Sequence, residues 1–106
     1  MIYRVTARFR TETAGELRRR LHDGSIAAQE PDGQEIVASL HRAVVTDRDV
    51  RWSETCFCEQ PLAHERATVL ERYFDSITTE PIEDHEQYDG EPFVEHLRTL
   101  QEDRNV

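Results

Sequence analysis

Hydrophobic residues recur along the chain with two periods, one of two residues and one close to 3.6 residues. The shorter period predicts half-buried strands, and the longer one predicts amphipathic helices. Capping residues, glycines and prolines mark where one element ends and the next begins. In chain order we expect a strand at 1–10, a helix from the capping box Thr13-x-x-Glu16 to Asp23-Gly24, a helix at about 34–42, a hairpin of 43–46 and 50–58 around the three-residue turn 47–49, a helix at 61–74, a strand at 75–82, an acidic loop at 85–91, and a helix from Pro92 to about residue 101.

This order, β-α-α-β-β-α-β-α, predicts an α+β fold in a single domain over residues 1–106. Without its second and last helices it is the split βαβ, or ferredoxin-like, pattern. Such a fold has an antiparallel sheet with helices on one face, and its other face is open. Residues 102–106 are expected to form a frayed tail.

Two stretches resemble known groups of proteins. Residues 2–9, followed by a helix rich in Glu, Leu and Arg, are similar in pattern to the dimeric α+β-barrel families. A second resemblance, to uncharacterised small bacterial proteins, rests on Cys56-Phe-Cys58, Pro61-Leu62, Glu65-Arg66 and Tyr73-Phe74. The first resemblance implies a homodimer with two facing sheets, and neither implies an activity. A low content of large aliphatic residues also favours a partner subunit that completes the core.

The net charge of −9 is concentrated in the second half of the chain. Residues 1–52 hold nine arginines against eight acidic residues, whereas residues 53–106 hold four arginines against fourteen. The second half would repel a phosphate backbone, so we expect no binding to nucleic acid. The chain has no lysine, which excludes a Schiff-base or P-loop lysine.

Other features favour a soluble protein of the cytoplasm. No apolar stretch approaches the roughly 20 residues that span a membrane, and the start of the chain lacks the pattern of a signal peptide. The two cysteines are therefore expected to be reduced thiols. The sequence contains no motif of the serine hydrolases, zinc proteases, P-loop proteins or dinucleotide-binding proteins.

The strand expected at 50–58 carries most of the unusual chemistry. Strand alternation places Glu54 on the same side as Trp52, Cys56 and Cys58. A carboxylate among such neighbours must be paired, protonated or open to water, because burial of an isolated charge is costly.

The helix expected at 61–74 offers a partner for this carboxylate. At 100° per residue, Arg66 falls inside the apolar arc of the helix, whereas Glu65 falls outside it. An arginine in such an arc either has a structural role, at the rim or in a salt bridge, or binds an anionic ligand.

Our first functional hypothesis is a pocket for a small, anionic molecule at the corner between this strand and helix. Arg66 would supply charge, and Glu54 would orient that charge or accept a proton. Trp52 and Tyr73 would form the wall. The protein would then be a binding module, or a cofactor-free enzyme of the dimeric α+β-barrel type.

Arg4 and Arg8 on the open face of the first strand are further candidates for ligand binding. If the hairpin strand is the neighbour of the first strand, Glu54 is expected to pair with one of these arginines across the sheet.

Cys56 and Cys58 allow three interpretations: inert thiols, a redox pair, or half of a zinc or copper(I) site. His64 or His85 would supply a further ligand to the metal. A thiolate metal site is therefore the second hypothesis. The third is a structural subunit that docks on another protein through its sheet face or its last helix.

Overall fold

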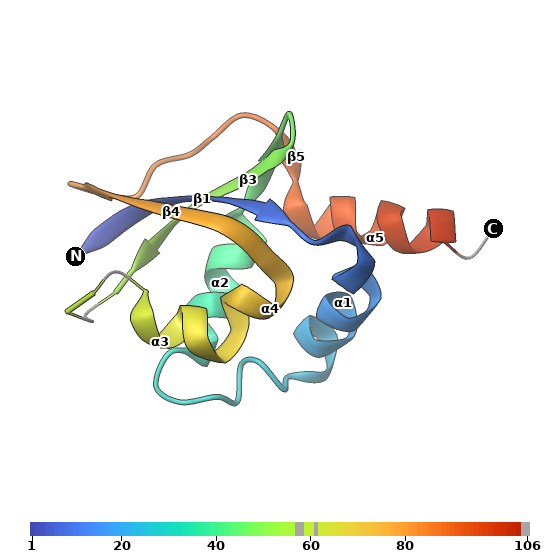
Figure 1. Ribbon diagram of the computed structural model, residues 1–106, viewed down its shortest axis with the longest axis horizontal. Coiled ribbons are helices and arrows are strands. Elements are labelled where there is room, and N and C mark those ends of the chain that lie inside the picture. The colour runs from blue at the N-terminus through green and yellow to red at the C-terminus, as the bar shows by residue number, and fades with distance from the viewer. Residues whose placement is uncertain (57–58, 61, 105–106) are drawn as a thin grey trace.

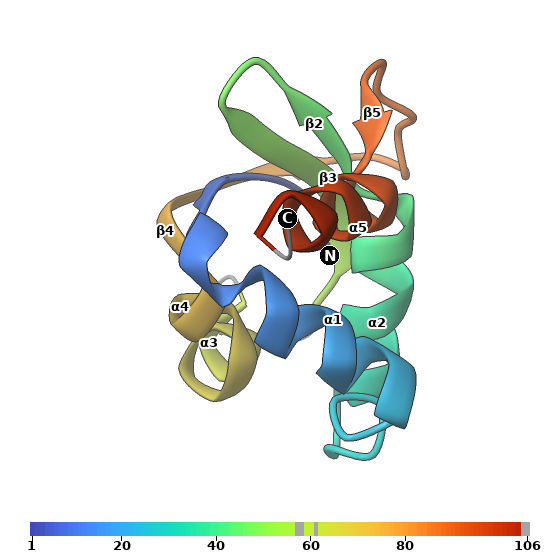
Figure 2. The same ribbon diagram turned by 90° about the vertical axis from the view of Figure 1, so that its right-hand side faces the viewer.

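The computed structural model describes residues 1–56, 59–60 and 62–104 (Figure 1). Within these residues a five-stranded antiparallel sheet packs against four helices, which confirms the expected α+β class. Figures 1 and 2 show the helices on one side of the sheet, which we call the inner face. The opposite side is the outer face. None of the helices in the described ranges is long and apolar enough to cross a membrane.

Two long strands form the centre of the sheet, and β4 forms one of its edges. The strands are β1 (Ile2–Phe9), β2 (Val44–Thr46), β3 (Asp49–Thr55), β4 (Phe74–Ile82) and β5 (Glu91–Pro92). Their spatial order is β4-β1-β3-β2-β5, and every neighbouring pair is antiparallel. The two-residue strand β5 was not expected from the sequence.

The helices lie close to their expected positions. They are α1 (Ala14–Asp23), which follows the short 3₁₀ turn η1 (Thr11–Thr13), α2 (Gly33–Arg42), a continuous helix made of α3 (Ala63–Glu65), η2 (Arg66–Leu70) and α4 (Glu71–Tyr73), and α5 (Phe93–Arg104). The middle segment η2 has π-helical geometry. α5 continues to Arg104, beyond the end at about residue 101 that we expected, and the frayed tail at 102–106 stays a prediction.

Aromatic rings fill the space between the inner face and the helices. Trp52 lies 5.3 Å from Phe74 between ring centroids, and Phe9 lies 5.1 Å from Phe93 in an edge-to-face contact. All four rings are buried. Such contacts add to the free energy gained by burying the rings themselves. This aromatic core joins β1, β3, β4 and α5, and it holds the central strands in place.

The capping box expected at the first helix does not form. The hydroxyl of Thr13 donates a hydrogen bond of 2.6 Å to the carbonyl oxygen of Arg10, and the Glu16 carboxylate pairs with Arg72 at 2.6 Å. The expected end of the helix is confirmed, because Gly24 caps it with a left-handed φ of 82°. Both partners of the expected box are therefore used in other contacts.

The hairpin turn is shorter than expected. Thr46 pairs with Asp49, so the loop contains two residues and not three. Asp47 adopts a φ of 52°, a left-handed conformation that aspartate tolerates better than most residues. A two-residue loop with this geometry follows the twist of the two strands.

The segment 83–90, which we call the outer strap, runs over the outer face of the sheet (Figure 1). His85 hydrogen-bonds through its two ring nitrogens to the hydroxyls of Ser53 and Thr55, at 2.8 and 3.2 Å. Glu86 pairs with Arg4 at 2.8 Å. The outer strap is thus attached to both central strands, and the face that was expected to be open is partly covered by the chain itself.

A close approach fixes the end of the outer strap. Gly90 has a φ of 153°, and a side chain there would collide with the carbonyl oxygen of Val45. Glycine is therefore required where the strap returns to the sheet at β5.

Candidate carboxyl site

Three acidic side chains meet on the inner face between β3 and the helix 63–73. We call Asp32, Glu54 and Glu65 the carboxyl cluster. Glu54 is 0% exposed and Glu65 is 2% exposed, although both belong to a residue type that is rarely buried. Glu54 contacts Glu65, and Glu65 contacts Asp32. The cluster therefore forms a chain of carboxyl groups that begins in the core.

Strand alternation directs Glu54 into the core. Its register partner on β1 is Tyr3, another inner-face residue, and Trp52 lies two positions earlier on the same face. The indole Nε1–H of Trp52 donates a hydrogen bond of 2.9 Å to Oε1 of Glu54. The expectation that Glu54 shares one side with Trp52 and Cys56 is confirmed, because all three are buried on the inner face.

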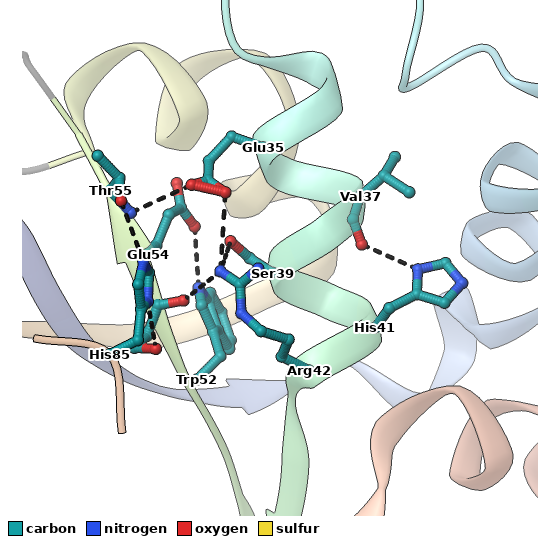
Figure 3. A network of polar contacts seen from close by, with 10 residues as sticks. Glu35, Val37, Ser39, His41, Arg42, Trp52, Glu54, Thr55 and His85 are labelled. Carbon is teal, nitrogen blue, oxygen red and sulfur yellow. Dashed lines mark hydrogen bonds and ion pairs between the residues drawn. The ribbon is translucent and has the colours of Figure 1, made fainter. Parts of the chain in front are cut away.

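Where the short strand β2 has ended, side chains from α2 form hydrogen bonds with the backbone of β3. Figure 3 shows Arg42 and Glu35 reaching from α2 toward β3. Arg42 donates to the Ser53 carbonyl oxygen at 2.9 Å, and the Thr55 N–H donates to Glu35 at 3.3 Å. These bonds satisfy backbone groups that β2 is too short to pair. The charge of Glu35 also lies near Glu54 and further raises the pKa of Glu54.

The π-helical segment brings Glu65 into the core. A π turn contains more residues than an α turn, so the buried side of the helix rotates relative to a regular 100° spacing. With this rotation Val69 and Tyr73 still face the sheet, but Glu65 faces it with them, and Arg66 is displaced toward the rim. The prediction that Arg66 lies inside the apolar arc and Glu65 outside it was wrong for this reason.

Burial raises the pKa of Glu54 to about 8, because the core penalises its charged form. The Trp52 hydrogen bond opposes this shift, and the negative charge of Glu65 adds to it. Oε2 of Glu54 has no hydrogen-bond donor among the described residues. The neighbouring Glu65 carboxylate is an acceptor, so the two groups form a hydrogen bond only when one of them carries a proton. Burial and the neighbouring carboxyl group therefore both favour the protonated form of Glu54, which could donate a hydrogen bond to Glu65.

Glu65 and Asp32 extend the cluster toward the surface. Burial raises the pKa of Glu65, and the charge of Asp32 raises it further. Both oxygens of Asp32 lie within 2.9 Å of the His64 Nδ1 atom, and the His64 side chain is 41% exposed. A side chain at Gly33 would collide with the Ile26 carbonyl oxygen, so glycine allows the close turn that holds Asp32 here. A connected path thus leads from solvent at His64 to the buried Glu54.

Arg66 does not reach this site. Its Nε atom donates to the Glu71 carboxylate at 3.2 Å, and its side chain is 39% exposed. Tyr73 is buried, but its hydroxyl accepts a hydrogen bond of 2.8 Å from Arg20, away from Glu54. Of the four side chains in our first hypothesis, the structure brings only Trp52 and Glu54 into contact.

The arginines of β1 face the opposite side of the sheet from Glu54. Arg4 pairs with Glu80 at 2.6 Å and with Glu86 at 2.8 Å, and Arg8 is exposed. The expectation that one of them pairs with Glu54 was wrong, although β1 and β3 are neighbours as supposed. The residue opposite Glu54 is Tyr3, and a shift of one position changes the face.

Two of the side chains proposed as ligands of a metal, Cys56 and His64, contact carboxyl groups instead. The buried Cys56 thiol donates to Oε2 of Glu65 at 3.9 Å, and His64 is held by Asp32. Cys58 lies outside the described residues. Within the described ranges, no group of three or more His, Cys, Asp or Glu side chains is placed to hold a metal ion. His85, the other proposed ligand, lies on the outer face with Ser53.

Glu65 and Asp32 were not predicted from the sequence as members of the site. Glu65 could have been suspected, because it lies next to Arg66 in the sequence and a small change in helical spacing exchanges the two positions. Asp32 gave no such indication, since it precedes a helix at an ordinary capping position.

The chemistry of this site follows from its charge. Three carboxyl groups lie together, and His64 contacts Asp32 at the outer end of the cluster. Such a site can store and transfer protons, and it favours a basic partner over an anion. No family model, curated protein or solved structure matches the chain.

Proposed function

We propose that the carboxyl cluster is an acid–base site that transfers a proton between Glu54 and a small, basic molecule. The observation that carries this proposal is a fully buried Glu54 with a second carboxyl group as its neighbour and no donor for Oε2 among the described residues. A carboxylic acid with a pKa of about 8 is protonated at neutral pH, and it is poised to give up its proton. This supports a cofactor-free acid–base enzyme.

The charge of the site favours a ligand of the opposite sign to the one expected from the sequence. The negative charges of Glu65 and Asp32 would oppose an anion, and Arg66 is engaged by Glu71. A neutral amine or imidazole would accept the Glu54 proton, and the resulting cation would be stabilised by the carboxylate it leaves. His64 would then return a proton from solvent through Asp32 and Glu65.

We further propose that β1 to β4 have a ferredoxin-like arrangement. The order β4-β1-β3-β2, with every pair antiparallel, supports it. In this arrangement β3 and the following helix meet at a corner beside the central strand. A catalytic group at that corner is rigidly held, because the strand and the aromatic core both fix its position.

Amide NMR of ¹⁵N-labelled protein, with imidazole, methylamine and acetate as probes, would test the proposal. We expect imidazole and methylamine to shift amides near Glu54 and Glu65, and we expect acetate to leave them unchanged. In Glu54→Gln, the loss of a charge-assisted hydrogen bond should weaken binding by about tenfold to a hundredfold. Glutamine still accepts the Trp52 hydrogen bond, so the fold is preserved.

Arg66→Gln is the matched control on the neighbouring helix. It should bind the basic probes as the wild type does, because Arg66 lies at the rim beside Glu71. The proposal is wrong if no basic probe shifts these amides, or if the Glu54→Gln protein binds equally well. Preferential binding of acetate that is lost in Arg66→Gln would support the anion pocket instead.

A further inference from the structure

The free edge of β4 is the longest unpaired strand edge in the described part of the sheet. β4 contains nine residues and pairs on one side only, with β1. An edge of this length presents unpaired N–H and C=O groups to any strand that approaches. At the other edge β5 contains only two residues. The β4 edge is therefore the better site for pairing with another chain.

The register shows which backbone groups of β4 face this edge. The Cys56 N–H donates to the Met1 carbonyl oxygen, so the backbone groups of Met1 point toward β3. Backbone direction alternates along a strand, hence Arg4 and Thr6 point toward β4 and pair with Glu80 and Thr78. The backbone groups of the residue between them, Thr79, must then point away from β1. Pro81, which has no N–H, follows the same direction.

We propose that two copies of this chain pair antiparallel through β4, with Thr79 opposite its own copy on a two-fold axis. In this register the two Thr79 residues exchange two N–H···O=C hydrogen bonds. Ile77 lies opposite Pro81 of the partner, which places an apolar side chain against an apolar one. Thr78 lies opposite Glu80 of the partner, so no like charges face each other beside the axis on the outer face. The sequence of β4 is thus complementary to itself.

Two further observations favour the edge over the face of the sheet. The outer strap occupies the outer face through Arg4, Ser53 and Thr55, so sheet-to-sheet pairing would have to displace it. On the inner side, depressions border β4 at Ile77 and Thr79, beside Arg66 and Glu71. They leave room for the side chains of an added strand. A ten-stranded sheet across the two copies would bury neither the strap nor the carboxyl cluster.

Charged residues introduced at position 79 provide the test. Because it compares two variants alone and in a mixture, an unfolded variant would not be mistaken for a weakened dimer. Thr79→Lys and Thr79→Glu each place two like charges opposite each other across the axis, whereas a mixture of the two variants places opposite charges there. Sedimentation velocity over a wide concentration range should show a wild-type dimer. Each variant alone should dimerise at least about tenfold more weakly, and the equimolar mixture should recover the dimer.

Thr78→Val is the control, because its side chain lies on the outer face next to the axis and its change adds no charge. It should dimerise within a few-fold of the wild type. The proposal is overturned if the wild type is a monomer at all concentrations. It is equally overturned if Thr79→Lys and Thr79→Glu dimerise as the wild type does, because the dimer would then use another surface.

Discussion

The carboxyl groups of two glutamates on opposite faces of the sheet have pKa values that are shifted in opposite directions. On the inner face Glu54 is buried beside other carboxyl groups, and burial raises its pKa to about 8. On the outer face Glu86 of the strap receives hydrogen bonds from Arg4, which lower its pKa below the ordinary value. The residue type is the same, and the two carboxyl groups lie on opposite faces of the same sheet, over neighbouring strands. The difference is the nature of the groups that the fold places opposite each carboxyl.

Polar contacts on the outer face stabilise the fold, whereas those of the carboxyl cluster point to a function. The outer ion pairs of Arg4 are partly exposed to water, where each contributes little. The inner contacts cost free energy, since a buried carboxyl group is left with too few donors. A chain that keeps such a group in its core keeps it at the expense of stability. Sites of that kind are where function is most often found.

The largest expected difference between the faces is in packing. Trp52→Ala should lower the free energy of unfolding by about 3–5 kcal/mol, because it opens a cavity in the aromatic core. Arg51→Ala, its neighbour on the outer face, removes a cation–π contact with Tyr88 and a positive charge near Glu86, and it should cost about 1 kcal/mol. Urea unfolding of both proteins measures the two values. Equal losses would contradict the division into a packed face and a solvated one.

The pH dependence of stability should differ next. The folded chain keeps the Glu54 proton up to a pH of about 8, whereas the unfolded chain loses it near the ordinary value of 4.5. The folded state therefore binds more protons in this range, and the free energy of unfolding falls as the pH rises.

Glu54→Gln removes this titration, so its stability should decline less between those pH values. The difference should be on the order of a few kcal/mol. Urea unfolding of both proteins at several pH values measures it, and Glu71→Gln, an exposed change, serves as control. Parallel pH profiles for Glu54→Gln and the wild type would show that Glu54 does not titrate as described.

The smallest expected effect concerns the outer strap. Arg4→Gln removes the charge that lowers the pKa of Glu86, so that pKa should rise toward its ordinary value. Amide hydrogen exchange in the segment 83–90 should become faster, while exchange in β3 stays slow. Arg8→Gln, which alters an exposed arginine on the same strand, should leave the segment unchanged. Exchange that is unaffected by Arg4→Gln would mean that other contacts, those of His85 with Ser53 and of Tyr88 with Arg51, hold the strap.

The sequence predicts the buried face correctly where the two-residue period of a strand determines it. The two-residue period of β3 correctly placed Glu54 and Trp52 on one buried face. The prediction failed at the helix 63–73, where a regular 100° spacing was assumed and a π segment changed the spacing. One extra residue in a turn was enough to exchange the positions of Glu65 and Arg66.

Contacts between distant parts of the chain were beyond a sequence-based prediction. The outer strap joins His85 to Ser53 across 32 positions and Glu86 to Arg4 across 82. The acidic loop was recognised, but its composition does not indicate which surface will receive it. Asp32 is another such case, because only the tertiary fold brings it to His64.

The indole of Trp52 has a use as an optical reporter. It is the only tryptophan in the chain, and its N–H bonds directly to the Glu54 carboxyl group. Intrinsic fluorescence therefore comes from a single chromophore in contact with a single titrating acid. A change of emission with pH would follow that one proton without any label, and its midpoint would give the pKa of Glu54 in the intact protein.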